Sequence, residues 1–421
     1  MTRLLYALAW LVATPLVVAR LAWRSRRQRG YLARLPERFG RYPPAPRAAR
    51  IWIHAVSVGE TRAAAPLVEA LGRRFPGRRI LLTHMTPTGW ATGVDLFGDT
   101  VERAWLPYDH GFAVRRFVEH FRPEFGLILE TEIWPRLIEE CARAGVPVVL
   151  ANARLSERSA RRYGRFPAIA RWAFANLAGV AAQTRPDAQR FEALGARDVA
   201  VTGNVKFDLA VPESMRELGR ELRARFGPGR PVWVAGSTRE GEEALLLDAF
   251  AAEGPPEALL VIVPRHPQRF EEVAALAVAR GFEVERRSGS APVAPGVRVL
   301  LGDSMGEMLA YYAAADVVIM GGSLLAFGSQ NLIEACAVGR PVVVGPHTWN
   351  FEEASESAIA AGAALRVRDA GEALRAARAL AADARRRGEM GEAALAFVAA
   401  HRGSVERLLA WLEPRVARRP A

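Results

Sequence analysis

The chain has 421 residues, enough for two domains of ordinary size, and half of them are hydrophobic. Its formal charge of +12 favours an anionic partner such as a membrane surface, a nucleic acid or a phosphorylated substrate. The two cysteines, Cys141 and Cys336, match neither a disulfide framework nor a zinc pattern, which excludes those classes and predicts core thiols.

The first predicted element is an apolar helix over residues 4–23, about one bilayer thickness in length. An arginine-rich run follows at 24–29, whereas only Arg3 precedes the helix, and this asymmetry predicts a cytoplasmic body. No convincing cleavage site follows, so we interpret residues 1–30 as a retained membrane anchor with its basic flank. Because Pro15 interrupts the apolar run, an amphipathic or buried helix is the alternative.

Strands and helices then alternate in two series, which predicts two α/β domains in tandem, each with a parallel sheet. We place the first domain at 31–211, an interdomain linker at 212–230 around a Pro- and Gly-rich stretch, and the second domain at 231–412. Helices are expected at 61–74, 212–226 and 370–412. Strands are expected at 50–56, 78–84, 125–130, 146–154, 179–184, 199–204, 231–236, 258–264, 297–301, 316–322 and 340–346. Ligands bind at the carboxyl ends of such strands, so the natural site is a cleft where the domains face each other.

Two loops of the first domain contain candidate catalytic or binding residues. Glu60 follows Gly59 at the start of a predicted helix, where the helix N-terminus would keep a carboxylate ionised. An ionised carboxylate facing a cleft can accept a proton from a substrate hydroxyl; an ordinary first-turn charge is the alternative. Lys206 is the only lysine in the chain, which indicates a need for a compact ammonium beside a carboxylate or phosphate, unless it stands there by chance.

The second domain offers candidate contacts for a nucleotide. Arg265 follows an apolar strand and could clamp a phosphate, with a solvated loop arginine as the alternative. Gly321 and Gly322 would permit a close backbone approach to a ligand. Asn331 and Glu334 share one face of the next helix, where an acid could hold ribose hydroxyls, or Asn331 could simply cap that helix.

Residues 302–307 (GDSMGE) contain the pattern G-x-S-x-G between a predicted strand and a predicted helix, the setting of a hydrolase nucleophile. A hydrolase would use Ser304 with His347 or His401. We favour the alternative, in which backbone N–H groups at the helix start hold a phosphate, because the hydrolase leaves the whole preceding domain unexplained. Walker, G-x-G-x-x-G, H-E-x-x-H and C-x-x-C patterns are absent, which disfavours kinases, dehydrogenases and zinc hydrolases.

Taken together, in order and spacing, these motifs resemble the 3-deoxy-D-manno-octulosonic acid (Kdo) transferases, from the anchor to about residue 400. The motifs are HAVSVGE (54–60), ETEIWP (130–135), NARLSERS (152–159), TGNVKFD (202–208), AGSTREGEE (235–243), PRHPQRF (264–270), GDSMGE (302–307), GGSLLAFGSQNLIEA (321–335) and GPHTWNF (345–351). Two positions depart from the family pattern: Arg239 stands where a histidine is expected, and Gly328-Ser329-Gln330 differs from the usual loop before Asn331.

The resemblance implies a GT-B fold, in which two Rossmann-like domains face a central cleft behind an N-terminal anchor helix. It implies CMP-Kdo as donor and a lipid A precursor (lipid IVA) as acceptor, in lipopolysaccharide biosynthesis at the cytoplasmic face of the inner membrane of a Gram-negative bacterium. It implies no metal, cofactor or nucleic acid. The family's proposed base falls on Glu60. Implied donor contacts are Ser237, Arg265, Met305, Gly306, Glu307, Asn331 and Glu334. Implied acceptor- or carboxylate-side residues are Ser57, Gly59, Glu132, Trp134 and Lys206.

The resulting hypothesis is an inverting transfer in which Glu60 takes the proton of the attacking hydroxyl and CMP leaves. Three rivals remain: a hydrolase acting through Ser304, a two-domain transferase or epimerase that uses a UDP-sugar, and a membrane-bound nucleotide-binding protein without turnover. Competition by CMP against UDP separates the donor classes.

Overall fold

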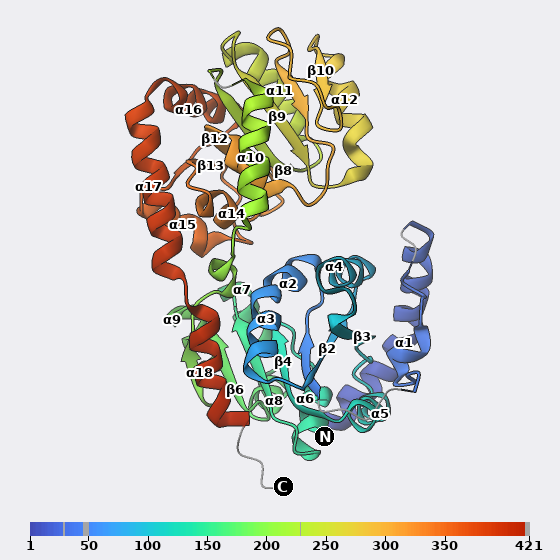
Figure 1. The fold of residues 1–421 in the computed structure, drawn as a ribbon. Coiled ribbons are helices and arrows are strands. Elements are labelled where there is room, and N and C mark those ends of the chain that lie inside the picture. The colour runs from blue at the N-terminus through green and yellow to red at the C-terminus, as the bar shows by residue number, and fades with distance from the viewer. Residues whose placement is uncertain (28–29, 45–49, 228, 417–421) are drawn as a thin grey trace. The chain divides into compact units, whose positions relative to one another are not determined.

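The computed structural model describes residues 1–27, 30–44, 50–227 and 229–416 (Figure 1). They divide into two compact units. The first unit consists of two segments, one that ends at Asp208 and one that begins at Gly403. The second unit comprises Leu209–Arg402. Each unit is a parallel sheet covered by helices on both faces, as the alternating pattern predicts.

The first unit contains a seven-stranded parallel sheet in the order β3-β2-β1-β4-β5-β6-β7. Its strands are β1 (Arg50–His54), β2 (Arg79–His84), β3 (Val101–Trp105), β4 (Pro123–Leu129), β5 (Val148–Ala153), β6 (Gly179–Ala182) and β7 (Val199–Val201). The central strands are apolar runs buried on both faces, which is why continuous hydrophobicity identified them in the sequence. The sequence analysis missed β3, in which Glu102 and Arg103 interrupt the apolar pattern.

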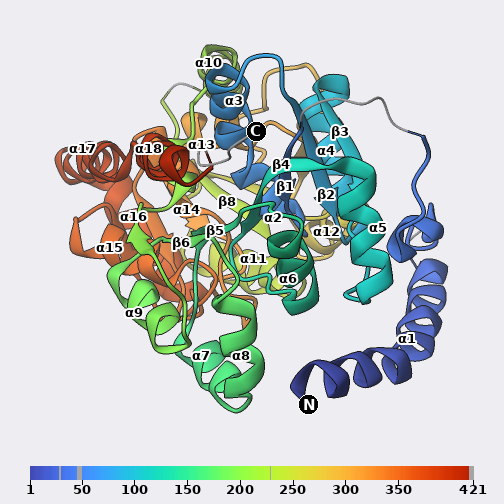
Figure 2. The same cartoon turned by 90° about the horizontal axis from the view of Figure 1, so that it is seen from below.

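Helices cover both faces of this first sheet. The helices of the unit are α1 (Thr2–Arg27), which lies beside the sheet rather than on it (Figure 2), and α2 (Val58–Ala63), α3 (Ala65–Arg74), α4 (Pro87–Phe97), α5 (Gly111–Phe121), α6 (Pro135–Arg143), α7 (Glu157–Gly164), α8 (Pro167–Phe174), α9 (Arg185–Ala193) and α18 (Ser404–Val416). Short 3-10 turns lie at Leu35–Phe39, Gly98–Thr100 and Val205–Asp208. One core cluster includes Leu67 and Phe125 and the other includes Trp52 and Phe117, one cluster on each face. The single helix expected at 61–74 is two helices, α2 and α3.

The second unit has a second seven-stranded parallel sheet, in the order β10-β11-β9-β8-β12-β13-β14. Its strands are β8 (Val232–Thr238), β9 (Leu259–Pro264), β10 (Val284–Arg286), β11 (Val299–Leu301), β12 (Val317–Met320), β13 (Val342–Val344) and β14 (Ala364–Arg366). Its helices are α10 (Glu213–Phe226), α11 (Glu242–Glu253), α12 (Phe270–Val278), α13 (Met308–Ala314), α14 (Leu332–Ala337), α15 (Glu352–Ala360), α16 (Ala370–Ala382) and α17 (Ala384–His401), with a 3-10 turn at Pro267–Arg269. A core cluster that includes Trp233, Phe250 and Ile319 joins this sheet to its helices.

The domain boundaries differ from the expected ones at both ends of the second unit. The segment expected as a linker, 212–230, is mostly helix α10, whose Gly219 approaches Ala313 of α13 so closely that a Cβ atom would lie 2.6 Å from the alanine Cβ. The expected helix 370–412 is three helices, and the last, α18, returns to the first unit. Leu408 and Leu412 of α18 are buried in the first core, and Asp208 accepts the backbone N–H of Gly403 at 2.6 Å.

Helix α1 is the predicted anchor, and among the described residues one helix is long and apolar enough to cross a membrane. It bends along its length (Figure 2), and Pro15, which cannot donate a backbone hydrogen bond, lies inside it. Leu4, Leu8 and Leu11 are exposed to more than two fifths, whereas Leu21 is buried. Both cysteines are buried free thiols, as expected.

Candidate functional site

The strand order of the first sheet reverses at β1, which lies between β2 and β4. The chain connections from β1 and β4 run to opposite faces of the sheet. The loops at the carboxyl ends of these two strands therefore border a crevice, which is where α/β proteins bind ligands. Here those loops are 55–57 after β1 and 130–134 after β4. They carry the candidate residues Ser57, Glu132 and Trp134, with Glu60 just inside α2.

Glu60 is held by hydrogen bonds to its own loop. The Ser57 hydroxyl accepts the Glu60 N–H at 3.4 Å, and the Glu60 carboxylate accepts the Val56 N–H at 2.7 Å and the Ser57 hydroxyl at 3.0 Å. This reciprocal capping arrangement follows from the S-x-x-E spacing of the sequence. Gly59 is exposed between them, with space for a side chain. The carboxylate therefore has one fixed position at the carboxyl end of β1.

The ionisation state of Glu60 differs from the sequence expectation. Burial, together with the charges of the neighbouring carboxylates Glu130 and Glu132, raises the pKa of this carboxyl to about 7, against the hydrogen bonds from Val56 and Ser57, which lower it. The sequence analysis expected Glu60 to stay ionised, whereas a carboxyl with a pKa of about 7 is only partly ionised at neutral pH; α2 has six residues, and its N-terminus does not offset the burial. A carboxyl with a pKa near 7 is suited to exchange a proton during turnover.

Lys206 lies within the same site but already has a partner. Its ammonium donates to the Glu130 carboxylate at 2.7 Å, and both side chains are mostly shielded from solvent. Glu130 adopts a φ of 59°, a left-handed conformation that is unfavourable for a side chain of this kind and that occurs mostly where surrounding structure enforces it. Sequence reasoning did not single out Glu130, because neither its backbone conformation nor its partner 76 residues away leaves a local signal.

Glu132 and Trp134 are half-buried on the loop that follows β4, and burial raises the pKa of Glu132. Trp134 also contacts α1: its ring lies 6.2 Å from the ring of Trp10, centroid to centroid. Helix α1 thus packs directly against the loop that carries two of the predicted acceptor-side residues.

A buried carboxylate fastens α1 to this part of the unit. Asp109 accepts the Tyr6 hydroxyl at 2.7 Å and the backbone N–H groups of Arg136 and Leu137 at 2.9 and 2.7 Å, so it joins α1 to the start of α6. Thr14 of α1 lies 2.7 Å from His110 Nε2. Tyr6, Trp10 and Thr14 recur every four residues, so one face of α1 is bound to protein.

In the second unit, the strand order reverses at β8, which lies between β9 and β12. The predicted donor-side loops follow β11, β9, β8 and β12, four consecutive strands of the sheet. Arg265 donates its backbone N–H to the Thr238 carbonyl at 3.0 Å, and Gly321 donates to Gly236 at 2.9 Å. A Cβ atom at Gly321 would lie 2.4 Å from the Ser237 carbonyl oxygen, so this glycine is required for contact between loops. Ser237 itself has a φ of 56°.

Asn331 is the N-cap of α14, as the alternative expectation had it: its side chain accepts the Ile333 N–H at 3.2 Å. The Asn331 amide also donates to the Glu334 carboxylate at 3.1 Å. The two residues therefore do lie side by side, as their spacing predicts, at the carboxyl end of β12.

The 302–307 loop follows β11 and does not form a hydrolase triad. The Ser304 hydroxyl bonds to the Glu307 carboxylate at 2.6 Å and to the Tyr311 hydroxyl at 2.7 Å, and Arg287 donates to Glu307 at 3.0 Å. Histidine is not among these partners. Met305 is exposed, and the positive φ in the loop belongs to Gly306, at 81°, rather than to the strained serine of a nucleophile elbow.

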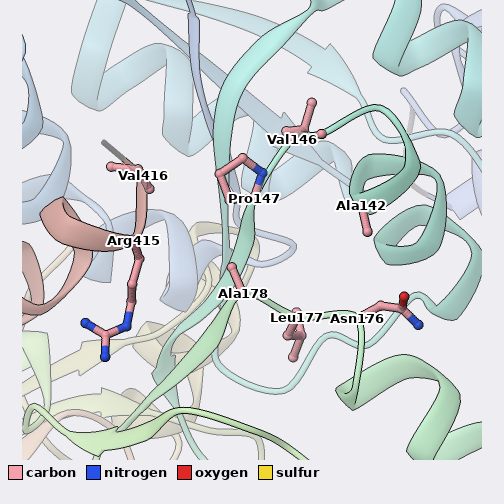
Figure 3. Close-up of a pocket in the computed structure, with 9 residues that line it drawn as sticks. Ala142, Val146, Pro147, Asn176, Leu177, Ala178, Arg415 and Val416 are labelled. Atoms are coloured by element: carbon pink, nitrogen blue, oxygen red, sulfur yellow. The ribbon is translucent and has the colours of Figure 1, made fainter. Parts of the chain in front are cut away.

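A cavity of about 280 Å³ lies elsewhere in the first unit (Figure 3). Val146 and Pro147 precede β5, Ala178 precedes β6, and Arg415 comes from α18, so this cavity is at the amino ends of the strands. The side chain of Arg415 donates to Asp198 at 2.6 Å. None of the predicted site residues lines the cavity.

Two doubly wound parallel-sheet units of this kind define the GT-B class of glycosyltransferases and related enzymes. UDP-GlcNAc 2-epimerase from Neisseria meningitidis, bound to UDP-GlcNAc, shares this fold with a TM-score of 0.61 at 15% identity, over 87% of this chain and all of that one. Such a low identity shows the fold alone.

Sequence comparison defines the family. Residues 33–209 match the model of the 3-deoxy-D-manno-octulosonic-acid transferase (kdotransferase) family. The 3-deoxy-D-manno-octulosonic acid transferase of Bordetella pertussis is 48% identical over 98% of this chain and 99% of its own length, and that of Haemophilus influenzae is 37% identical over 99% and 100%. The chain belongs to the Kdo transferase family and is a glycosyltransferase.

Proposed function

We propose that this protein transfers Kdo from CMP-Kdo to a hydroxyl of a lipid A precursor, with Glu60 as the general base. The observation that supports this most is the state of Glu60: a carboxyl fixed at the reversal point of the first sheet, with a pKa of about 7. A base whose pKa lies near the working pH combines a sizeable ionised fraction with useful proton affinity.

In this mechanism the acceptor hydroxyl oxygen attacks the anomeric carbon of Kdo while its proton passes to Glu60. The bond from that carbon to the phosphate oxygen breaks, and its electron pair leaves with CMP, so the configuration inverts. Glu132 and Trp134 would border the acceptor. Lys206 would offset the charge of Glu130, its ion-pair partner. Its ammonium would shift toward the Kdo carboxylate when the donor binds.

The donor side is assigned to the second unit. Ser237 lies near the end of β8, Arg265 follows β9, and Asn331 and Glu334 lie at the start of α14, around the point where doubly wound sheets bind nucleotides. Arg265 is suited to a phosphate. Asn331 and Glu334 offer an amide and a carboxylate for ribose hydroxyls. The backbone of Met305, Gly306 and Glu307 would complete the donor contacts at the end of β11.

The experiment for donor and acceptor uses the full-length chain in detergent with CMP-Kdo and a lipid A precursor. We expect an acceptor product carrying Kdo with inverted anomeric configuration, identified by mass spectrometry and NMR, and no product with a UDP-sugar. Release of CMP without a glycosylated product would instead indicate hydrolysis and contradict the assignment.

The membrane is proposed as a partner of α1 at the cytoplasmic face of the inner membrane. One face of α1 is bound to the first unit through Tyr6, Trp10 and Thr14, whereas Leu8 and Leu11 are exposed. A helix bound to a globular unit along one side fits embedding in one leaflet better than spanning, because the charged groups packed beside it would otherwise enter the hydrocarbon.

Replacing the exposed leucines tests this arrangement. The double variant Leu8→Ser with Leu11→Ser should move the chain from the membrane fraction to the soluble fraction. Leu245→Ser, at an exposed leucine of the second unit, is the matched control and should stay with the membrane. Retention of the double variant in the membrane would contradict an anchor formed by this face.

A further inference from the structure

Positive charge gathers at the carboxyl ends of β8 and β9. Burial lowers the pKa of His266, and the positive charges of Arg239, Arg265 and Arg269 lower it as well. The three guanidinium groups therefore lie near one imidazole. Arg269 is neutralised where it stands, because it donates to the Glu243 carboxylate at 2.5 Å and to Glu272 at 3.0 Å. The arrangement of Arg239 is different.

Arg239 is half-buried, and its guanidinium carbon lies 4.6 Å from the ring centroid of Phe327, a residue of the loop that follows β12. Within the described part of the chain, Arg239 forms no ion pair with a carboxylate. A guanidinium stacked on an aromatic ring keeps its N–H edges available for a planar anion while the ring fixes its orientation.

A buried carboxylate holds the backbone around this arginine. Glu242, the first residue of α11, is fully buried and accepts the Arg239 N–H at 2.8 Å. The same carboxylate accepts N–H groups from the loop after β12, from Gly322 at 2.6 Å and Leu324 at 3.0 Å. Glu242 therefore fixes the loop that carries Arg239 to the loop that carries Phe327.

We propose that Arg239 binds an anionic group of the donor, and that Phe327 and Glu242 are positioning residues that hold its guanidinium in place. This inference rests on the proposed function, since the donor supplies the anion. CMP-Kdo carries two candidates of the same chemistry, the phosphodiester and the Kdo carboxylate, and a guanidinium fork fits either one. Arg239 stands where the family resemblance predicts a histidine, so in this chain a guanidinium fork is available at that position.

Binding measured without acceptor tests the inference independently of turnover. Calorimetric titrations of the full-length wild-type protein and of Arg239→Ala with CMP-Kdo and with CMP are compared, and Arg368→Ala is the matched control at an exposed arginine of the same unit. We expect Arg239→Ala to raise the Kd of CMP-Kdo about 10- to 100-fold, the loss typical of a hydrogen-bonded charged group. The Kd of CMP-Kdo for Arg239→Lys should lie between those of the wild type and Arg239→Ala, because lysine keeps the charge but not the planar fork.

The two ligands identify the anion. An equal rise in the Kd of CMP assigns the phosphate, whereas an unchanged Kd of CMP assigns the Kdo carboxylate. Wild-type affinity of Arg239→Ala for both ligands would overturn the inference and leave the proposed function intact. If the wild-type protein bound neither ligand, the proposed function would fail and the inference with it.

The positioning residues are tested through Phe327→Leu and Glu242→Gln. In transfer assays both should raise the KM for CMP-Kdo with little change in kcat and in the KM for the acceptor. Glu240→Gln, exposed two residues before Glu242, is the control. A general loss of structure would lower kcat and the melting temperature together, and unchanged donor KM in both variants would contradict the positioning role.

Discussion

The two units share a doubly wound parallel sheet, although their strand orders differ at one edge, and they differ in the charge gathered where the strand order reverses. In the first unit the loops after β1 and β4 bring together carboxylates, Glu60, Glu130 and Glu132, with Lys206 as the cation. In the second unit the loops after β8 and β9 present arginines, and the carboxylates Glu242 and Glu243 are buried beneath them. The same scaffold thus offers proton acceptors in one unit and anion contacts in the other.

Burial raises the pKa of both Glu60 and Glu242, but the two carboxylates have different partners. Glu242 accepts backbone N–H groups from two loops and serves as a fixed structural link. Glu60 accepts bonds from one loop and has carboxylate neighbours, so burial leaves it able to take a proton near neutral pH. Partners rather than burial alone decide whether a buried carboxylate is structural or reactive.

The largest expected effect comes from removing the base. Glu60→Gln keeps the shape of the side chain but cannot accept the hydroxyl proton, so kcat for Kdo transfer should fall about 10²- to 10⁴-fold. Binding of CMP-Kdo, measured by calorimetry, should stay unchanged, because the proposed donor contacts lie in the other unit. Glu69→Gln, at an exposed glutamate of α3, should be active. Normal turnover by Glu60→Gln would reject a role for this carboxylate.

Replacing either member of the ion pair beside Glu60 should have a smaller effect, and the two replacements should shift the pH–rate profile in opposite directions. Glu130→Gln removes a neighbouring negative charge, so the pKa of Glu60 should fall and the acid limb of the pH–rate profile should move to lower pH. Lys206→Ala leaves Glu130 without its cation, so the limb should move to higher pH. Shifts in the same direction for both variants would contradict an electrostatic coupling to Glu60.

The smallest effect is expected at Ser304. Ser304→Ala removes hydrogen bonds to Glu307 and Tyr311, and the change in kcat/KM should be at most about tenfold, since a neutral hydrogen bond contributes about 0.5–1.5 kcal/mol. Complete loss of activity, with the protein still folded, would restore the serine hydrolase as an explanation.

Local patterns predicted much of this molecule. Continuous apolar strands identified most of both sheets, and the position of Glu60 after Gly59 placed it at the start of a predicted helix. The raised pKa of Glu60 could not be predicted, because it comes from burial in the folded unit and from Glu130, which follows another strand in a left-handed backbone conformation. Glu242 joins two loops that are 80 residues apart in the sequence. Helix α18 belongs to the first unit, although the whole second unit precedes it in the sequence. Long-range contacts of this kind leave no periodic signal in the sequence.

The most direct test of the central claim is the pH dependence of single-turnover Kdo transfer by the wild-type chain and by Glu60→Gln. Because the raised pKa keeps Glu60 protonated below about 7, the wild-type rate should rise about tenfold per pH unit at low pH and level off above pH 7. The residual rate of Glu60→Gln should lack this limb. A limb at the same pH in both proteins would show that another group accepts the proton.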